Sequence, residues 1–311
     1  MYVHHPALPV TLGVVRLSDH LTFFQILAGA GIGGLIFSPV IRTLLSAVGG
    51  RWTLRIYALF NLLAGLPTAW AVPRSRFSAT VSTNGPTEED GGGRGREMRN
   101  THISRALALQ PAFLLSAVAA FLQAAGAQLP LAFIPSYSVI LGLTASTGAN
   151  LLAASNAINA VSRVATGYAG DKFGRQNTLV LTLLLAAVSV FAFWLTSVVS
   201  VGGSSSSLWL AFIVVYSLSA GGYYALFPAL IAEVFGIRQY AAVNAFILFV
   251  RGLGTMFGSP VGGQLLGDSK HGTGAYTSIA YWDGALLMGA TLCCVGVRWA
   301  DGKGKGWRWI A

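Results

Sequence analysis

The sequence predicts an all-α protein, a polytopic membrane helix bundle with about eight transmembrane helices. Composition is the first indication: of 311 residues, 54% are hydrophobic and only 10% are charged, with a mean hydropathy of +0.64, whereas about 25% of a soluble domain is charged. The second indication is a series of apolar stretches, each near the ~20 residues that an α-helix needs to cross ~30 Å of hydrocarbon. Together these observations exclude a water-soluble globular domain.

The first two predicted spans cover residues 22–46 and 52–72. A G-x-G-x-x-G pattern begins at Gly29, but a dinucleotide-binding unit also needs an acidic residue about 20 positions later. No Asp or Glu occurs from Leu21 through Thr87. We therefore interpret Gly29 and Gly33, one helical turn apart, as a helix-packing surface, because small residues let membrane helices approach closely.

A change of composition separates these two spans from the rest of the chain. Between Pro73 and Arg105 the sequence is dominated by Ser, Thr and Gly, with an acidic run followed by arginines. Such a segment cannot bury enough apolar surface to fold, so it predicts a disordered cytoplasmic linker. The expected organisation is an N-terminal segment at 1–21, two spans within 22–72, the linker at 73–105, a six-helix unit at 106–298 and a cytoplasmic tail at 299–311.

Lysine and arginine predict the orientation of the chain. An alternating path through eight spans puts both termini on one face, which holds fourteen of the 20 basic residues, while three lie on the opposite face and three within spans. The positive-inside rule therefore makes both termini cytoplasmic. The net charge of +10 is spread over short loops, which indicates topogenic charge and contact with membrane lipid, not nucleic acid. We expect the plasma membrane and not an organelle.

The last six spans are predicted at 107–130, 146–168, 177–199, 207–231, 240–265 and 279–298.

A charged turn follows the fourth span. From Gly167 to Arg175 the chain reads G-x-x-x-D-K-x-G-R, with Asp171, Lys172 and Gly174 at the motif positions. This turn resembles the cytoplasmic signature of the major facilitator superfamily, which joins the eighth and ninth helices of a twelve-helix carrier. The resemblance implies a latch for one conformation, with close packing at Gly167 and with Asp171 paired to Arg175 or facing a helix N-terminus. The alternative is simple topogenic charge.

Further motifs are similar to one branch of that superfamily. Gln110 to Tyr137, followed by Asn156, Asn159 and Arg163, looks like the seventh and eighth helices of the monocarboxylate-transporter-like branch common in fungi. The glycines from Gly258 to Gly263 look like its eleventh helix, with Gly258 and Gly262 as helix-packing residues. The resemblance covers roughly residues 27–298. It implies a complete second half at 106–298, the last two helices of a first half at 22–72, and no counterpart for the first four helices.

Polar residues within the spans are the candidate binding site. Asn156, Asn159 and Arg163 are spaced i, i+3 and i+7, so they share one helix face. Arg251 is near the middle of its span, and Asn244 precedes it by two turns on the same face. An arginine in hydrocarbon costs at least ~2.5–3.5 kcal/mol on insertion scales, so it should face a partner, the protein interior or a water-filled cavity. Arg42, near the end of its span, is expected to reach outward to the interface.

No acidic residue is expected well inside a span, because Glu233 and Asp283 are placed at span ends. An uncompensated cationic cavity favours an anionic solute, and a carboxylate fits the planar fork of arginine. The alternatives are that the arginines bond helix ends or carbonyl groups and that the asparagines bond neighbouring helices. The aromatic residues of the sixth span either line the cavity or pack; they are Tyr216, Tyr223, Tyr224 and Phe227.

The resemblance also bears on proton coupling. Proton-linked monocarboxylate carriers place a substrate-coordinating arginine at the position of Arg163 and an aspartate one turn earlier. Here that earlier residue is Asn159, whose amide does not titrate as a carboxyl does. Proton coupling is therefore not assignable to this position, and facilitated movement or a different coupling residue is favoured.

These observations predict a secondary transporter, a symporter or uniporter, that moves a small organic solute by alternating access. We expect the solute to be a monocarboxylate or a similar anion. The alternative is a truncated, non-transporting carrier remnant with a binding or regulatory role. No enzyme is expected, because acidic residues are few and peripheral and the histidines are scattered. We expect no cofactor, no metal and no nucleic-acid partner.

Overall fold

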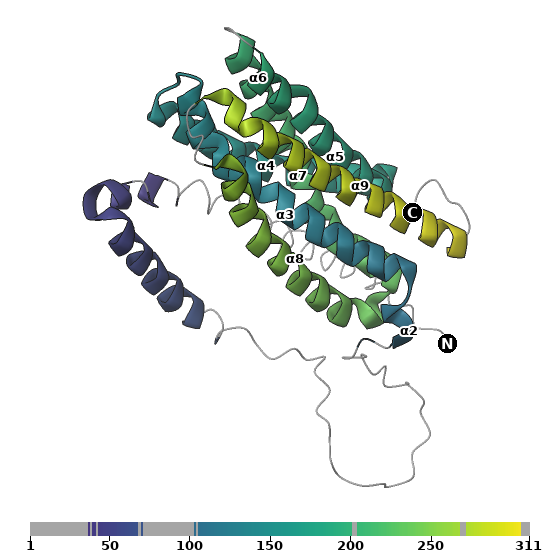
Figure 1. Ribbon diagram of the computed structural model, residues 1–311. Helices are drawn as coiled ribbons and strands as arrows, with labels where there is room; N and C mark the ends of the chain where they lie inside the picture. Colours follow the sequence, from purple (N-terminus) through teal and green to yellow (C-terminus); the bar gives the residue numbers. More distant parts are fainter. Residues whose placement is uncertain are drawn as a thin grey trace, which may run out of the picture.

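A computed structural model describes residues 37, 39–41, 43–67, 70, 103, 105–200, 204–267 and 272–305, without the side chains of 237, 238, 304 and 305. Within those ranges the chain forms a bundle of long helices (Figure 1). The long helices are α3 (Pro111–Ile140), α4 (Ala145–Phe173), α5 (Arg175–Ser189), α7 (Ser204–Phe235), α8 (Ile237–Leu266) and α9 (Thr277–Lys305). Short elements are α2 (Arg105–Ala108), η1 (Val190–Leu195), α6 (Thr196–Val199) and η2 (Thr273–Tyr276).

Local features of the sequence explain where several helices begin and end. Pro111 stands at the first position of α3, where its missing N–H has no helical partner to lose. The Thr144 hydroxyl accepts a hydrogen bond from the Thr147 N–H at 3.1 Å and so caps α4. Gly174, between α4 and α5, has φ 91°, and Gly236, between α7 and α8, has φ 78°. Glycine adopts this left-handed region without the penalty that a Cβ brings.

Two predicted boundaries are wrong. The span expected at 107–130 continues as α3 to Ile140, through Pro130 and Pro135. Proline is tolerated in a membrane helix because neighbouring helices and local adjustments satisfy the carbonyl groups that it frees. The last span, expected to end at 298, continues as α9 to Lys305, so the first residues of the expected tail are helical.

The helices pack as two sets that share the bundle core. α3 packs mainly against α8 and α9, while α7 packs mainly against α4 and α5. One end of the core is a cluster of aromatic rings, in which Trp209 and Phe212 stack with centroids 5.2 Å apart. The Trp209 indole N–H donates to the Ser138 hydroxyl at 2.9 Å, so the buried ring keeps a polar partner. This cluster packs α3, α7 and η1 against one another.

Glycines let α8 approach the backbone of α3. Gly254, Gly258 and Gly262 occupy successive turns of one α8 face. A Cβ built on Gly258 would stand 2.1 Å from the Ala125 carbonyl oxygen, and one on Gly262 would stand 2.4 Å from the Leu129 side chain. Only glycine fits at such a separation, which is the small-residue packing typical of membrane helices.

Five helices of the described chain are long and apolar enough to cross a membrane. They cover Pro111–Ile140, Arg175–Val199, Ser204–Phe235, Gln239–Leu266 and Thr273–Lys303. The second of these joins α5, η1 and α6, with η1 as a π-helical segment in the middle. The predicted fourth span forms α4, whose 29 residues are long enough, but its asparagine, serine and arginine residues make it the most polar long helix.

Helical residues also run from 43 to 67, drawn in purple in Figure 1. Gly49, with φ 76°, lies between the first two predicted spans. Apolar side chains on this segment are exposed, including Leu54 at 70% and Leu66 at 63%. Gly29, Gly33, Arg42, the segment 1–21 and nearly all of the linker 73–105 lie outside the described residues.

Candidate functional site

The two arginines singled out within the spans meet at one aromatic ring. The guanidinium carbon of Arg163 lies 4.8 Å from the centre of the Tyr224 ring, and that of Arg251 lies 4.9 Å from it. Less than 10 Å therefore separates the two guanidinium carbons. Because the three residues come from α4, α8 and α7, this ring joins three helices of the bundle.

Close contact between α4 and α7 positions Arg163 and Tyr224. A Cβ on Gly221 would stand 2.8 Å from the Asn159 carbonyl oxygen, so the glycine lets α7 touch the α4 backbone one turn before Tyr224. The Ser162 hydroxyl donates to the Leu218 carbonyl oxygen at the same crossing. On α4, the Arg163 Nε–H donates to the Asn159 Oδ1 at 3.0 Å. The asparagine thus holds the guanidinium from one turn below, where the sequence placed both on one face.

Arg251 lies midway along the 30 residues of α8. Its guanidinium carbon is also 5.1 Å from the centre of the Tyr223 ring, so both tyrosines contact it. Its Nε is buried and has no hydrogen-bond partner in the described part of the chain, and the same holds for the Tyr223 hydroxyl. A buried donor without an acceptor costs about 1–3 kcal/mol. The geometry therefore leaves donor capacity beside the ring for a bound acceptor.

The other predicted site residues differ in their surroundings. Asn156 and Asn244 are half-buried on the helices of Arg163 and Arg251, and neither has a hydrogen bond from its side chain to a described residue. Tyr216 and Phe227 are buried in the core, where they pack. Tyr224 is the one ring of the four that is half-buried. Sequence periodicity could not separate it from its neighbours, because the four share one apolar helix.

Asp283 corrects the expectation that acidic residues stand only at span ends. It is 0% exposed, seven residues into α9, against Gly126 of α3. The sequence suggested a span from 279, which left Asp283 one turn from its end, but the helix starts at Thr277 and is covered by α3 from its first turns. The sequence does not indicate this burial, because hydropathy does not reveal which helix covers a residue.

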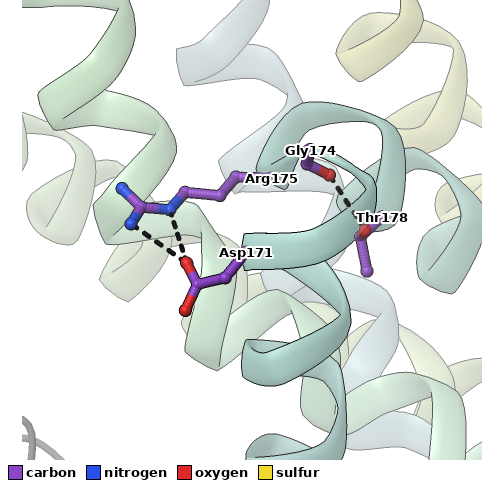
Figure 2. Close-up of polar contacts among 4 residues, drawn as sticks. All are labelled: Asp171, Gly174, Arg175 and Thr178. Carbon is purple, nitrogen blue, oxygen red and sulfur yellow. Dashed lines mark hydrogen bonds and ion pairs between the residues drawn. The ribbon is translucent and has the colours of Figure 1, made fainter. Parts of the chain in front are cut away.

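The charged turn joins α4 to α5 and is drawn in Figure 2. The guanidinium of Arg175 donates to the Asp171 Oδ1 from Nη2 at 3.1 Å and from Nε at 3.3 Å. The Thr178 hydroxyl donates to the Gly174 carbonyl oxygen at 2.9 Å. The Lys172 Nζ lies 5.7 Å from the centre of the Tyr168 ring. The pair is exposed and joins the end of α4 to the start of α5 across Gly174, so its direct stabilisation is small, about 0.2–1 kcal/mol.

Close packing occurs at a different glycine of this turn from the one expected. A Cβ at Gly167 would meet no described atom within 4 Å, whereas one at Gly170 would stand 2.5 Å from the Leu226 side chain of α7. Three residues at about 100° each bring Gly170 to within about 60° of the face of Gly167 but nearly one turn further along α4, and the contact with α7 lies at that later position. The expectation of close packing at Gly167 is therefore wrong among the described contacts.

A polar cluster beside the turn was not anticipated. The Gln176 Nε2 donates to the Glu233 Oε1 at 2.8 Å and to the Asp301 Oδ2 at 3.0 Å. Next to it, the Arg298 Nε donates to the Asn177 Oδ1 at 3.1 Å. These bonds join α5, α7 and α9 at the end of the bundle that holds the charged turn. The only indication of this cluster in the sequence is the pair of amide side chains, Gln176 and Asn177, directly after the motif.

Comparison with known proteins agrees with this architecture. The profile of the Major Facilitator Superfamily matches residues 25–259 and 116–306. An MFS-type transporter of Gibberella moniliformis is 27% identical over 280 residues, 90% of this chain and 61% of that protein. The riboflavin transporter MCH5 of Saccharomyces cerevisiae is 22% identical over 289 residues, which cover 87% and 53%. The aspyridones efflux protein apdF of Emericella nidulans is 24% identical over 298 residues, which cover 91% and 53%.

The chain spans between half and two thirds of the length of these relatives. Their names describe transporters, of riboflavin in one case and of aspyridones outward in another. The matched profile covers more than half of the chain and includes the helices that carry Arg163, Arg251 and the charged turn. The protein is an integral, multi-pass membrane protein, and the chain belongs to the major facilitator superfamily.

Proposed function

We propose that the protein takes part in secondary transport of a small organic anion, a monocarboxylate or a similar carboxylate, by alternating access. The observation that carries the proposal is the convergence of Arg163 and Arg251 on Tyr224, from three helices. Carriers of this kind bind solute near the membrane midplane between two halves that rock about the site. Arg251, midway along α8, is at the corresponding depth.

Two like charges at this separation favour an anion between them. Each guanidinium raises the electrostatic potential at the other, and the low dielectric of the protein interior makes that repulsion stronger than in water. A carboxylate would reduce it and would accept charge-assisted hydrogen bonds from the guanidinium N–H groups. The unsatisfied Arg251 Nε supplies one such donor. The Tyr223 hydroxyl supplies a second polar contact beside it.

We further propose that the charged turn gates the cytoplasmic side. Asp171 and Arg175 hold the end of α4 to the start of α5, and Gly170 brings the same turn against α7. An exposed ion pair contributes little to stability, so breaking and remaking it during transport costs little. The cytoplasmic placement of this turn rests on the distribution of lysine and arginine.

Uptake by proteoliposomes tests the binding role of the arginines. The purified chain would be reconstituted and the saturable uptake of a radiolabelled monocarboxylate, pyruvate, measured for the wild type and for Arg163→Ala. Losing a charge-assisted hydrogen bond costs about 1.5–3 kcal/mol, which corresponds to roughly a 10- to 100-fold rise in KM. Arg163→Lys should recover part of this loss, because lysine keeps the charge without the planar fork.

Arg55→Ala is the matched control, since Arg55 is exposed on the N-terminal helical segment. Its uptake should equal that of the wild type. Unchanged saturable uptake by Arg163→Ala would contradict the proposed site, because the arginine would then have only a structural role. No saturable uptake by the wild type itself would favour a non-transporting binding protein instead.

A further inference from the structure

Asp283 is a buried acid that the arginine site does not use. Its side chain is 0% exposed, and both carboxyl oxygens are buried without a hydrogen-bond partner in the described residues. It is not in the first turn of α9, where the helix dipole would stabilise a negative charge. An ionisable residue inside a membrane protein is costly and is retained mainly for function.

Two close helix contacts lie at Asp283 and at the residue that follows it. A Cβ on Gly126 of α3 would stand 3.0 Å from the Asp283 Oδ1, so the glycine provides the space that the carboxyl occupies. On the next residue of α9, a Cβ on Gly284 would stand 2.5 Å from the Phe191 ring of η1. Phe191 belongs to the π-helical segment, a distortion that is frequent at functional sites. The carboxyl itself lies against α3 and is closed to bulk water, since Asp283 is 0% exposed, while the adjoining contact holds α9 against η1.

The surrounding charges do not compensate an ionised carboxyl. Asp283 forms no ion pair with a described residue. The phenol of Tyr216 lies within electrostatic range of it, and its hydroxyl donates to the Ala127 carbonyl oxygen at 3.1 Å. Arg175 and Arg298 lie at the far ends of α5 and α9. By sequence, the elements packed against α9 carry the titratable residues Tyr137 of α3, Arg175 of α5, Arg238, Tyr240 and Arg251 of α8, and Tyr276 of η2, and η1 carries none. Besides Asp283, α9 itself carries Tyr281, Cys293, Cys294, Arg298, Asp301, Lys303 and Lys305.

We propose that Asp283 is a proton-binding site and that it holds its proton in this conformation. An isolated buried carboxylate is so unfavourable that the group neutralises instead of remaining charged. When α9 separates from α3 at Gly126, water reaches the carboxyl, the O–H bond breaks and the proton passes to water, leaving a carboxylate. The reverse closure takes up one proton. The site lies on α9, away from Asn159, the position that cannot titrate.

The consequence for transport rests on the proposed function. α3 and α9 belong to the same expected half, so proton exchange needs a movement of α9 against α3 within that half. If this movement accompanies each rocking of the two halves, one proton is exchanged per cycle through Asp283. The protein would then couple the solute anion to a proton with a carboxyl outside the solute site.

Infrared spectroscopy of the full chain in lipid tests proton binding without requiring transport. At pH 7 the wild type should show a protonated-carboxyl C=O band that Asp283→Asn lacks, because an amide of nearly the same shape replaces the acid. The control Asp301→Asn should keep the band, since Asp301 lies at the other end of α9 and accepts a hydrogen bond from Gln176. Absence of the band in the wild type, or its persistence in Asp283→Asn, would overturn the proposal.

Counterflow of radiolabelled pyruvate in proteoliposomes tests the coupling. The wild type should show counterflow and additional uptake driven by a pH gradient, whereas Asp283→Asn should retain counterflow and lose the response to the gradient. Counterflow in the wild type without any response to the gradient would overturn the coupling role alone. Absence of counterflow in the wild type would overturn the coupling role and the proposed transport together, while the infrared band would still decide whether Asp283 binds a proton.

Discussion

At the scale of single residues, Tyr224 organises the candidate site. Its half-buried ring contacts the guanidinium groups of Arg163 and Arg251, which would otherwise lie in a low-dielectric interior with reduced solvation. The face of an aromatic ring carries partial negative charge and attracts a cation by about 0.5–2 kcal/mol, more when the pair is desolvated. The ring thus holds two cations close together, and Arg251 keeps a buried Nε donor without a hydrogen-bond partner among the described residues.

This arrangement predicts different effects of two substitutions at Tyr224. Tyr224→Leu removes both cation–π contacts, and we expect roughly a 5- to 50-fold rise in the KM for pyruvate uptake. Tyr224→Phe keeps the ring and should remain within a few-fold of the wild type. Saturation curves from proteoliposomes measure both. Equal KM values for the Leu and Phe variants would show that the ring does not position the arginines.

At the scale of helices, the contact between α3 and α8 depends on glycine. Arg251 stands one turn before Gly254, the first of three glycines that face α3. The separation of the two backbones is set where a Cβ on Gly258 would come within 2.1 Å of the Ala125 carbonyl oxygen. A side chain there must move the helix, because the atom that it meets is backbone and cannot rotate away.

We predict that Gly258→Ala destabilises the bundle. Overpacking of this kind costs about 1–3 kcal/mol, which exceeds the gain of ~1 kcal/mol in helix propensity from Gly to Ala. Gly263→Ala, on the same helix, is the matched control, since a Cβ there would meet nothing within 4 Å. Thermal unfolding in detergent, followed by circular dichroism, should show a lower Tm for Gly258→Ala and an unchanged or higher Tm for Gly263→Ala. The opposite order would contradict the packing argument.

At the scale of the whole molecule, the basic residues of the described helices gather at one end of the bundle. Lys172, Arg175, Arg298 and Lys303 belong to the end where α5, α7 and α9 are joined by the Gln176 cluster. In the described residues of the opposite end, around the α3–α4 turn, Ser200 and η2, there is no lysine or arginine. The positive-inside rule predicts that the basic end faces the cytoplasm.

Epitope accessibility tests this orientation. A tag at the C-terminus should be recognised by antibody only after the plasma membrane is permeabilised. A tag inserted after Gly142, in the α3–α4 turn, should be recognised on intact cells if the protein is in the plasma membrane. The reverse pattern would contradict the cytoplasmic termini, and staining of neither tag on intact cells would place the protein in an internal membrane.

Much of the helix plan follows from local sequence. Backbone N–H and C=O groups in hydrocarbon must be hydrogen-bonded within their own helix, so a long run of apolar residues predicts a spanning helix. The same local logic put Asn159 and Arg163 on one face, and they are hydrogen-bonded. The predicted end of α3 at residue 130 was wrong, because the surrounding helices decide whether a proline ends a membrane helix. Close packing at Gly170 in place of Gly167 likewise depended on which face meets α7.

The sequence by itself determined the class of the protein, its membrane location, the order of its helices and the residues that carry charge within them. Only the tertiary structure decided that Arg163 and Arg251 meet at Tyr224, and that Asp283 is buried against α3. The physical reason is that hydropathy is read along one helix at a time. Contacts between distant residues depend on the rotation and axial offset of neighbouring helices, which close packing of side chains and glycines sets.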